Sequence, residues 1–167
     1  KANMLANELL TIIFLLSYLG CALLCYKLGR DWLQNFLVIS YIITMAIASK
    51  FFDFFGLTMS MANITYAGLF LATDMMTERY GREAGYQTVR IGFLAAALFA
   101  GATLFSLLPV PVGFSQDTHD AMSIVFGGSA RVMIGGFTVY LFIQHFDVWL
   151  YHRIREWTGE KYVWVRN

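Results

Sequence analysis

Long apolar stretches separated by short polar connections constrain this chain more than any other feature. Four of them run approximately over Leu9 to Tyr26, Trp32 to Ser49, Gly56 to Thr77 and Val89 to Leu108. A helix needs about 20 apolar residues to cross the hydrocarbon core of a bilayer, whereas the strands of an outer-membrane barrel alternate over about ten residues. The lengths therefore predict membrane-crossing helices and disfavour a barrel.

The composition supports this interpretation, because 58% of the residues are hydrophobic and only 14% are charged. A soluble domain has about 25% charged residues, so this chain has too few to cover a surface that faces water. We expect an all-α, polytopic helical membrane protein that forms a single integral membrane domain over residues 1–167. The formal net charge of +1 gives no indication of a nucleic-acid partner.

A fifth helical segment is predicted between Asp117 and Arg155, but its length is about 40 residues. At about 1.5 Å per residue it is too long for one perpendicular crossing. We expect a break at Gly127-Gly128 or at Gly135-Gly136, with a short interfacial or half-inserted helix before a crossing that begins near Arg131. One long tilted helix that extends into the cytoplasm is the alternative.

The basic residues of the connections predict an orientation with the N-terminus outside and the C-terminus inside. The connection before Trp32, the connection near Gly81 and the segment after the fifth crossing are expected to be cytoplasmic. Their basic residues are Lys27, Arg30, Arg79, Arg82, Arg90, Arg153, Arg155, Lys161 and Arg166. The intervening connections have few positive charges, and the pattern alternates without conflict over five crossings.

The sequence contains no catalytic or metal-binding motif that we can identify. Cys21 and Cys25 lie four residues apart in the first apolar stretch, where helical geometry does not favour a disulfide, so we expect them to behave as small hydrophobic side chains. The three histidines form no His-Glu-x-x-His motif or Cys/His cluster. An enzyme that uses Asp74 and Glu78 as an acid/base pair is disfavoured, so we predict no enzymatic activity, no metal and no cofactor.

The third apolar stretch has a polar stripe on one helical face, formed by Asn63, Phe70, Asp74 and Glu78. Acidic residues at membrane depth are energetically costly and usually functional. The alternative interpretation is structural. In it, Glu78 pairs with Arg82 one turn later, and Asp74 caps the helix or reaches the interface.

The fifth segment has a second stripe, in which Arg131, Thr138, His145 and His152 recur every seven residues, with Gln144 and Asp147 to one side. A guanidinium close to the membrane needs an anionic or carbonyl partner. Arg131 is therefore expected either to bind a ligand or to form an internal ion pair with Asp74 or Asp147.

Two motifs resemble the queuosine precursor transporters, also called the vitamin uptake transporter family. The first is Phe70-Leu-Ala-Thr-Asp74 followed by Glu78-Arg-Tyr-Gly81 and Glu83-Ala84. In the second, Arg131 precedes Tyr140, Gln144 and Asp147-Val-Trp-Leu-Tyr-His-Arg153. The resemblance covers approximately Asn35 to Asn167, so residues 32–167 would form the transporter core and residues 1–31 an accessory first helix.

The resemblance implies an inner-membrane, multi-pass importer of 7-deazaguanine bases, such as 7-cyano-7-deazaguanine or 7-aminomethyl-7-deazaguanine, which are salvaged for transfer RNA modification. A carboxylate can accept two adjacent N–H donors of such a base, and Asp74 is the first candidate for this role. Rings of Phe70, Tyr66, Tyr140 or Trp149 would stack on the base, while Asn63, Gln144 and Arg131 would address its carbonyl edge. The expected substrate-binding set is Asn63, Phe70, Asp74, Glu78, Arg131, Tyr140, Gln144 and Asp147.

Several alternatives stay open at this point. Members of the family usually continue beyond Trp164-Val-Arg-Asn167 into two further crossings, so the chain is either a fragment or a shorter member. Two alternative functions also stay open. The chain is then either the substrate-binding subunit of an ATP-driven vitamin-type importer or a membrane assembly protein that transports nothing. Glycines that permit close helix approach leave homo-oligomerisation open.

Overall fold

A computed structural model describes residues 2–127 and 130–158 of the protein. The elements within these ranges are α1 (Ala2–Leu28), α2 (Arg30–Ile47), β1 (Phe51–Phe54), β2 (Leu57–Ser60), α3 (Ala62–Tyr80), α4 (Arg82–Ser106), the 3-10 turn η1 (Gly113–Ser115), α5 (Gln116–Met122), the π-helical turn η2 (Ser123–Gly127) and α6 (Ala130–Thr158). The fold is thus mostly helical, as predicted.

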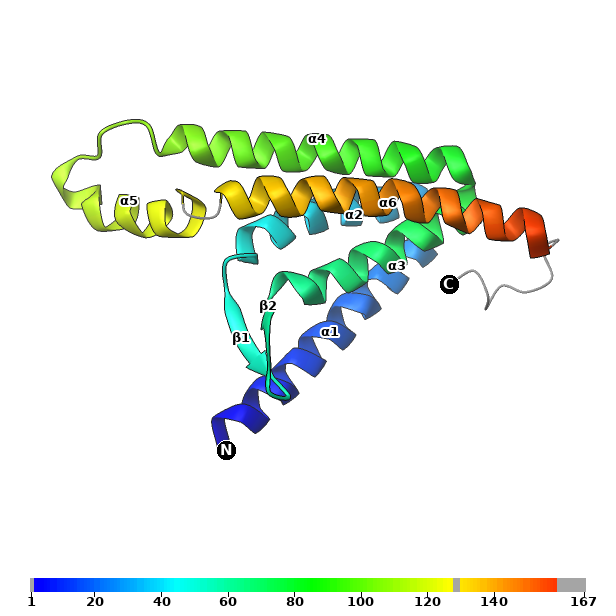
Figure 1. Cartoon of the computed structure of the whole chain (residues 1–167), viewed down its shortest axis with the longest axis horizontal. Helices are drawn as coiled ribbons and strands as arrows, with labels where there is room; N and C mark the ends of the chain where they lie inside the picture. Colours follow the sequence, from blue (N-terminus) through cyan, green and yellow to red (C-terminus); the bar gives the residue numbers. More distant parts are fainter. Residues whose placement is uncertain (1, 128–129, 159–167) are drawn as a thin grey trace.

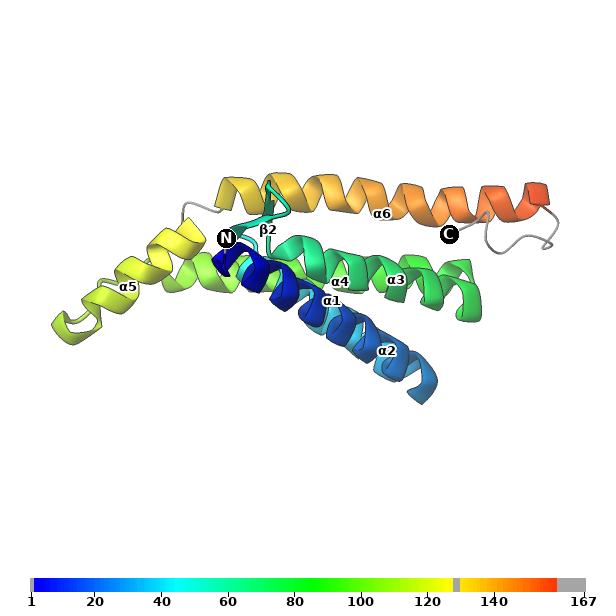
Figure 2. The same ribbon diagram turned by 90° about the horizontal axis from the view of Figure 1, so that it is seen from below.

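The helices are arranged in three layers. Helices α3 and α4 lie between α1 and α2 on one side and α6 on the other (Figure 2). Helices α4 and α6 run antiparallel along the longest dimension of the molecule, and α5 lies beyond the end of the other helices (Figure 1). The middle layer can therefore present side chains to α6 on one side and to α1 and α2 on the other.

The core lies where α1, α2, α3 and α4 meet. Large apolar side chains of α2 and α3 fill it, and Leu33, Leu37, Leu69 and Met76 are fully buried. Close approach depends on small residues: a Cβ on Gly68 of α3 would lie only 2.4 Å from the ring of Tyr18 in α1. Glycine at such positions lets neighbouring helices pack closely, as is common between membrane helices.

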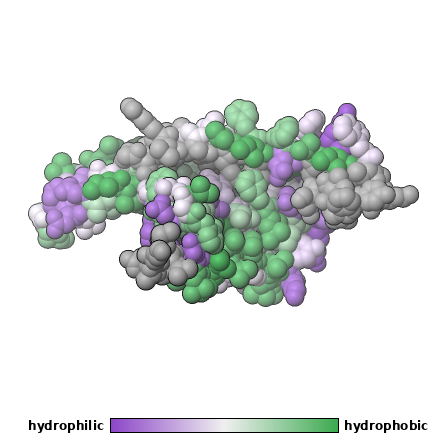
Figure 3. Space-filling view, turned by 60° about the horizontal axis from the view of Figure 1, so that its bottom comes forward, coloured by the Kyte–Doolittle hydropathy of each residue, from purple (hydrophilic) through white to green (hydrophobic). Residues whose placement is uncertain are grey.

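Apolar side chains also cover much of the exterior. On α1 and α4, Leu16 and Leu98 are each 64% exposed, and Phe105 is 73% exposed. Figure 3 shows hydrophobic residues gathered over the middle of one face. Extended exposed apolar surface marks contact with lipid or another apolar partner. Asn7–Leu28 and Arg82–Ser106 are the two candidate membrane spans in the described part of the chain.

The hairpin of β1 and β2 was not predicted, since we expected only helices and a third crossing that began at Gly56. The strands pair antiparallel, with Phe51 opposite Ser60 and Phe54 opposite Leu57. Phe55 and Gly56 form the turn with φ values of 50° and 80°, the two positive values that a tight hairpin turn requires. Aromatic residues favour strands, and α3 consequently begins only at Ala62.

The predicted break in the fifth segment is present. Helix α5 continues into η2, which ends at Gly127, and α6 begins at Ala130, while Gly128 lies outside the described residues. Gly135 and Gly136 lie inside α6, so the alternative break position and the single long helix were both wrong.

Candidate functional site

Asp74 lies on α3, where its side chain is half-buried at the edge of the packed face. The residues beside it, Thr73 and Ala72, are fully buried against the other helices. The charge of Asp147 on α6 acts on the Asp74 carboxyl, so the two acids lie near one another. Helical periodicity therefore directs Asp74 out of the core and toward α6.

Asp147 is half-buried as well, and it precedes Val148, which is only 2% exposed and fixes this part of α6 on the bundle. Helix α6 packs mainly on α4 and also contacts α3. The structure thus places Asp74 and Asp147, both predicted site residues, on two helices in contact and within electrostatic range of one another. Two like charges repel at short range, so such a pair favours a bound proton, a cation or a ligand with hydrogen-bond donors.

Aromatic side chains lie on the same stretch of α3. Tyr66 and Phe70, two turns and one turn before Asp74, are half-buried and pack against the core. Their faces can form an apolar wall beside the acidic pair, the kind of surface on which a flat ring stacks.

Helix α4 adds contacts that the sequence analysis missed. The ring of Tyr86 stacks on that of His145 in α6, with a centroid distance of 5.8 Å and an interplanar angle of 26°. Arg82 donates a hydrogen bond of 3.1 Å from Nη2 to the Tyr86 hydroxyl. This contact joins α4 to α6 two residues before Asp147. The spacing of Arg82 and Tyr86 was visible in the sequence, but the partner on α6 was not.

The predicted polar stripe on α3 extends along a greater length of the helix than one small ligand can contact. Asn63 lies in the first turn of α3 and is exposed, and it precedes Asp74 by 11 residues, which is about 16 Å along the helix axis. Glu78 is exposed one turn after Asp74. One planar base that contacts Asp74 therefore cannot also contact Asn63, whereas Glu78 lies within reach of the same region.

Three further predicted residues, Arg131, Tyr140 and Gln144, belong to α6, but their side chains lie outside the described part of the structure. Their helical positions still decide which of them can share a site. Tyr140 and Gln144 precede Asp147 by seven and three residues, hence by about 10 Å and 5 Å along the axis, whereas Arg131 precedes it by about 24 Å. Arg131 consequently lies far from Asp74 and Asp147 along the axis of α6.

Among the described residues, no group of three or more His, Cys, Asp or Glu side chains is placed to hold a metal ion. The site built by α3, α4 and α6 consists of two carboxyls, aromatic rings and a histidine. Such a set can bind a polar, planar molecule through hydrogen bonds and stacking.

Comparison with known proteins gives two matches. Residues 60–167 match the protein family described as "Putative vitamin uptake transporter". A curated relative from Bacillus subtilis (strain 168), named "Probable queuosine precursor transporter", is 28% identical over 163 residues, which cover 96% of this chain and 71% of the relative. No solved structure matches the chain.

Proposed function

The chain belongs to the vitamin uptake transporter family, and from this premise we propose that it imports queuosine precursors, the 7-deazaguanine bases, across the inner membrane. The family and the related protein from Bacillus subtilis support a transporter that resides in a membrane. The exposed apolar surfaces of α1 and α4 agree with a lipid environment. The base as substrate is our extension of the relative's name to this chain.

In this proposal α1, α2, α3, α4 and α6 each cross the membrane. Helices α1 and α4 have the length and apolar character for it on their own, and α2, α3 and α6 pack against them. The N-terminus lies outside and the basic connections around Gly29 and Gly81 lie in the cytoplasm, where positive charge is favoured. The hairpin of β1 and β2 then lies at the outer surface.

The placement of Asp74 and Asp147 on two helices in contact, within electrostatic range of one another, is the observation that supports the proposed binding mode. A deazaguanine base offers adjacent N–H donors on one edge, and an ionised carboxylate can accept both of them. Donors from the ligand would also offset the repulsion between two ionised acids. Asp74 accepts the paired donors in this mode, and Asp147 accepts a further one from the opposite helix.

The remaining predicted residues divide by distance from this pair. Phe70 supplies the stacking surface, while Glu78, Gln144 and Tyr140 lie close enough along their helices to reach the ligand. Asn63 and Arg131 are too far along the helices for the same contact. Their role in the proposal is to bind the base at another stage of its passage.

Asp74→Asn tests the binding mode, because it keeps the shape of the side chain and replaces one acceptor oxygen by a donor. Hydrogen bonds to charged groups contribute about 1.5–3 kcal/mol each, so we expect affinity for the base to fall by at least about tenfold. The measurement is equilibrium binding of labelled deazaguanine base to the purified protein, with guanine as competitor. Uptake by cells that cannot synthesise the precursor gives the matching transport readout.

Glu83→Gln is the matched control, since Glu83 is an exposed acid in the first turn of α4. This variant should bind and transport as the unmodified protein does. Normal uptake by Asp74→Asn at normal expression would refute the binding mode. If the unmodified purified protein bound no deazaguanine base at all, the proposed substrate would be wrong.

A further inference from the structure

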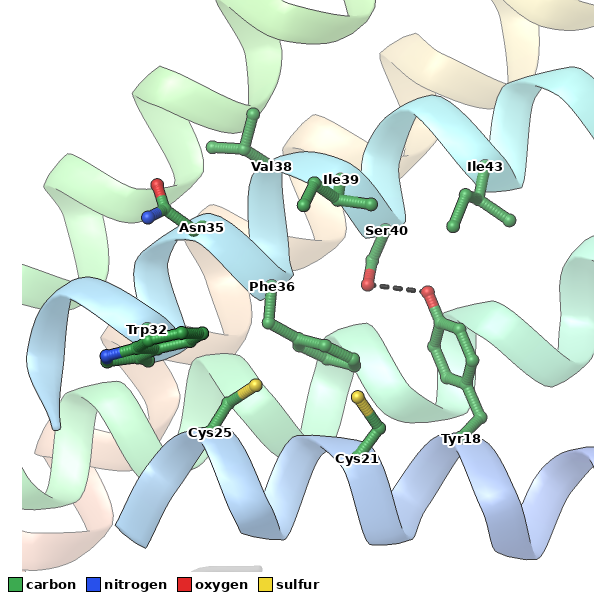
Figure 4. A pocket seen from close by; sticks show the side chains of 10 residues that line it. All are labelled: Tyr18, Cys21, Cys25, Trp32, Asn35, Phe36, Val38, Ile39, Ser40 and Ile43. Atoms are coloured by element: carbon green, nitrogen blue, oxygen red, sulfur yellow. Dashed lines mark hydrogen bonds between the residues drawn. The ribbon is translucent and has the colours of Figure 1, made fainter. Parts of the chain in front are cut away.

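A groove of about 490 Å³ lies between α1 and α2, on the side of the bundle away from α6. Figure 4 shows the two helices antiparallel, with Cys25 close to Trp32 at one end and Tyr18 close to Ser40 at the other. The other residues that line it are Cys21, Asn35, Phe36, Val38, Ile39 and Ile43. The groove is thus separate from the acidic pair of α3 and α6.

The chemistry of the lining favours an aliphatic occupant over a polar one. Most lining side chains are apolar, and the Tyr18 hydroxyl donates a hydrogen bond of 2.5 Å to Ser40 Oγ, so these two groups already satisfy one another. Cys21 and Ile39 are exposed along the rim, with apolar surface directed outward. A flat base rich in hydrogen-bonding groups would leave most of those groups unsatisfied here.

The length of the groove matches one leaflet of a bilayer. On α1 the lining extends from Tyr18 to Cys25, which is about 10 Å, and on α2 from Trp32 to Ile43, which is about 16 Å. One half of the hydrocarbon core is about 15 Å thick. A lipid chain that enters at the Trp32 end would therefore extend along the groove to the end where Tyr18 and Ser40 lie.

Positive charge gathers at that entrance. Lys27 and Arg30 flank the connection between α1 and α2, each two residues from the lining residue of its helix. Arg79 reaches the same place, where it donates a hydrogen bond of 2.8 Å to the carbonyl oxygen of Tyr26. Three cations against Asp31 leave a formal charge of +2 at this end. Basic clusters beside helices on the cytoplasmic side attract anionic lipid headgroups.

We propose that this groove is a binding site for an anionic phospholipid, with an acyl chain between α1 and α2 and its phosphate beside Lys27 at the basic end. In the orientation proposed above, the lipid belongs to the cytoplasmic leaflet. It holds α1 against α2 where protein side chains leave space. The site does not depend on which molecule the protein transports.

Trp32 lines the groove and provides the reporter for a test. A protein with Trp149→Phe, Trp157→Phe and Trp164→Phe retains Trp32 alone, and it is placed in phosphatidylcholine nanodiscs. Phosphatidylglycerol with brominated acyl chains is then added in increasing mole fraction, because bromine quenches indole fluorescence at short range. Brominated phosphatidylcholine in the same amounts shows how much quenching comes from unselected surrounding lipid.

We expect half-maximal quenching at a lower mole fraction of phosphatidylglycerol than of phosphatidylcholine. Lys27→Gln should raise the required phosphatidylglycerol fraction by about fivefold, the effect of one basic residue near an anionic surface. Lys50→Gln is the matched control, since Lys50 is exposed beyond the opposite end of α2 and should leave the curve unchanged.

Two results would overturn the proposal. Identical curves for the two lipids would show that Trp32 meets only unselected bilayer lipid. Protection of Trp32 from both lipids, increasing with the number of protein copies in each nanodisc, would show that a second copy of the chain covers the groove.

Discussion

Replacing Gly92 by alanine probes how closely α4 packs against α2. A Cβ at this position would lie 1.9 Å from Cε2 and 2.4 Å from Cδ2 of Tyr41. Tyr41 is only 3% exposed, so its ring has no solvent-filled space into which it can turn. Insertion of one methyl group into a well-packed core costs about 1–3 kcal/mol, and the very short distance places this variant at the upper end.

Gly101→Ala on the same helix separates the clash from the change in helix propensity. No atom lies within 4 Å of a Cβ built on Gly101. Both substitutions remove a glycine from a helix and gain up to about 1 kcal/mol in helix propensity, so this contribution is shared. The difference between the two variants therefore isolates the contact with Tyr41, and we expect Gly92→Ala to be less stable by about 2–3 kcal/mol.

The assay is unfolding of the purified protein in mixed micelles with increasing sodium dodecyl sulfate, followed by circular dichroism. Equal free energies of unfolding for Gly92→Ala and Gly101→Ala would refute the packing of α4 on Tyr41. Tyr41→Ala provides an internal check, because in its background Gly92→Ala should lose most of its additional cost.

Three further predictions concern other contacts. Thr88→Val removes the hydroxyl that donates a hydrogen bond of 2.8 Å to Gln34 Oε1, so we expect the free energy of unfolding in the same assay to fall by about 1–3 kcal/mol. An unchanged free energy of unfolding would contradict this hydrogen bond between α4 and α2. Gly81→Ala places a Cβ on a residue with φ 87° and ψ 173°, so we expect the free energy of unfolding to fall by about 1–3 kcal/mol. An unchanged free energy of unfolding would mean that the turn between α3 and α4 has another conformation. Asp147→Asn should lower the affinity for a deazaguanine base about tenfold in equilibrium binding while the protein stays in the membrane, since it removes one charged acceptor from beside Asp74; disappearance of the protein from the membrane would indicate a structural role instead.

The helices were largely predictable because their apolar stretches are long and continuous. The second predicted stretch, Trp32 to Ser49, corresponds closely to α2, Arg30–Ile47. The fourth was predicted from Val89, whereas α4 begins at Arg82, because polar residues continue the helix beyond the apolar part. The hairpin escaped prediction because a short aromatic run can be read equally well as connection or strand.

The candidate site was predictable only within each helix. Periodicity placed Phe70, Asp74 and Glu78 on one face of α3, and α3 has that periodicity in the structure. It gave no means of deciding whether Arg131 would pair with Asp74 or with Asp147, or of expecting the two acids to lie near one another. The contact between Tyr86 and His145 was missed for the same reason, since it joins two helices whose relative level the sequence does not state.

The sequence by itself determined that the chain is mostly helical and that acidic residues lie within its apolar segments. It also determined the family to which the chain belongs. Apolar length and 3.6-residue periodicity are local properties, so they can be read from neighbouring residues. The tertiary structure decided that Asp74 lies within electrostatic range of Asp147, and it also decided where a groove remains between α1 and α2. The proximity of the two acids and the position of the groove both depend on the axial offset between neighbouring helices. That offset is set by the packing of residues distant in the chain, such as Gly92 against Tyr41.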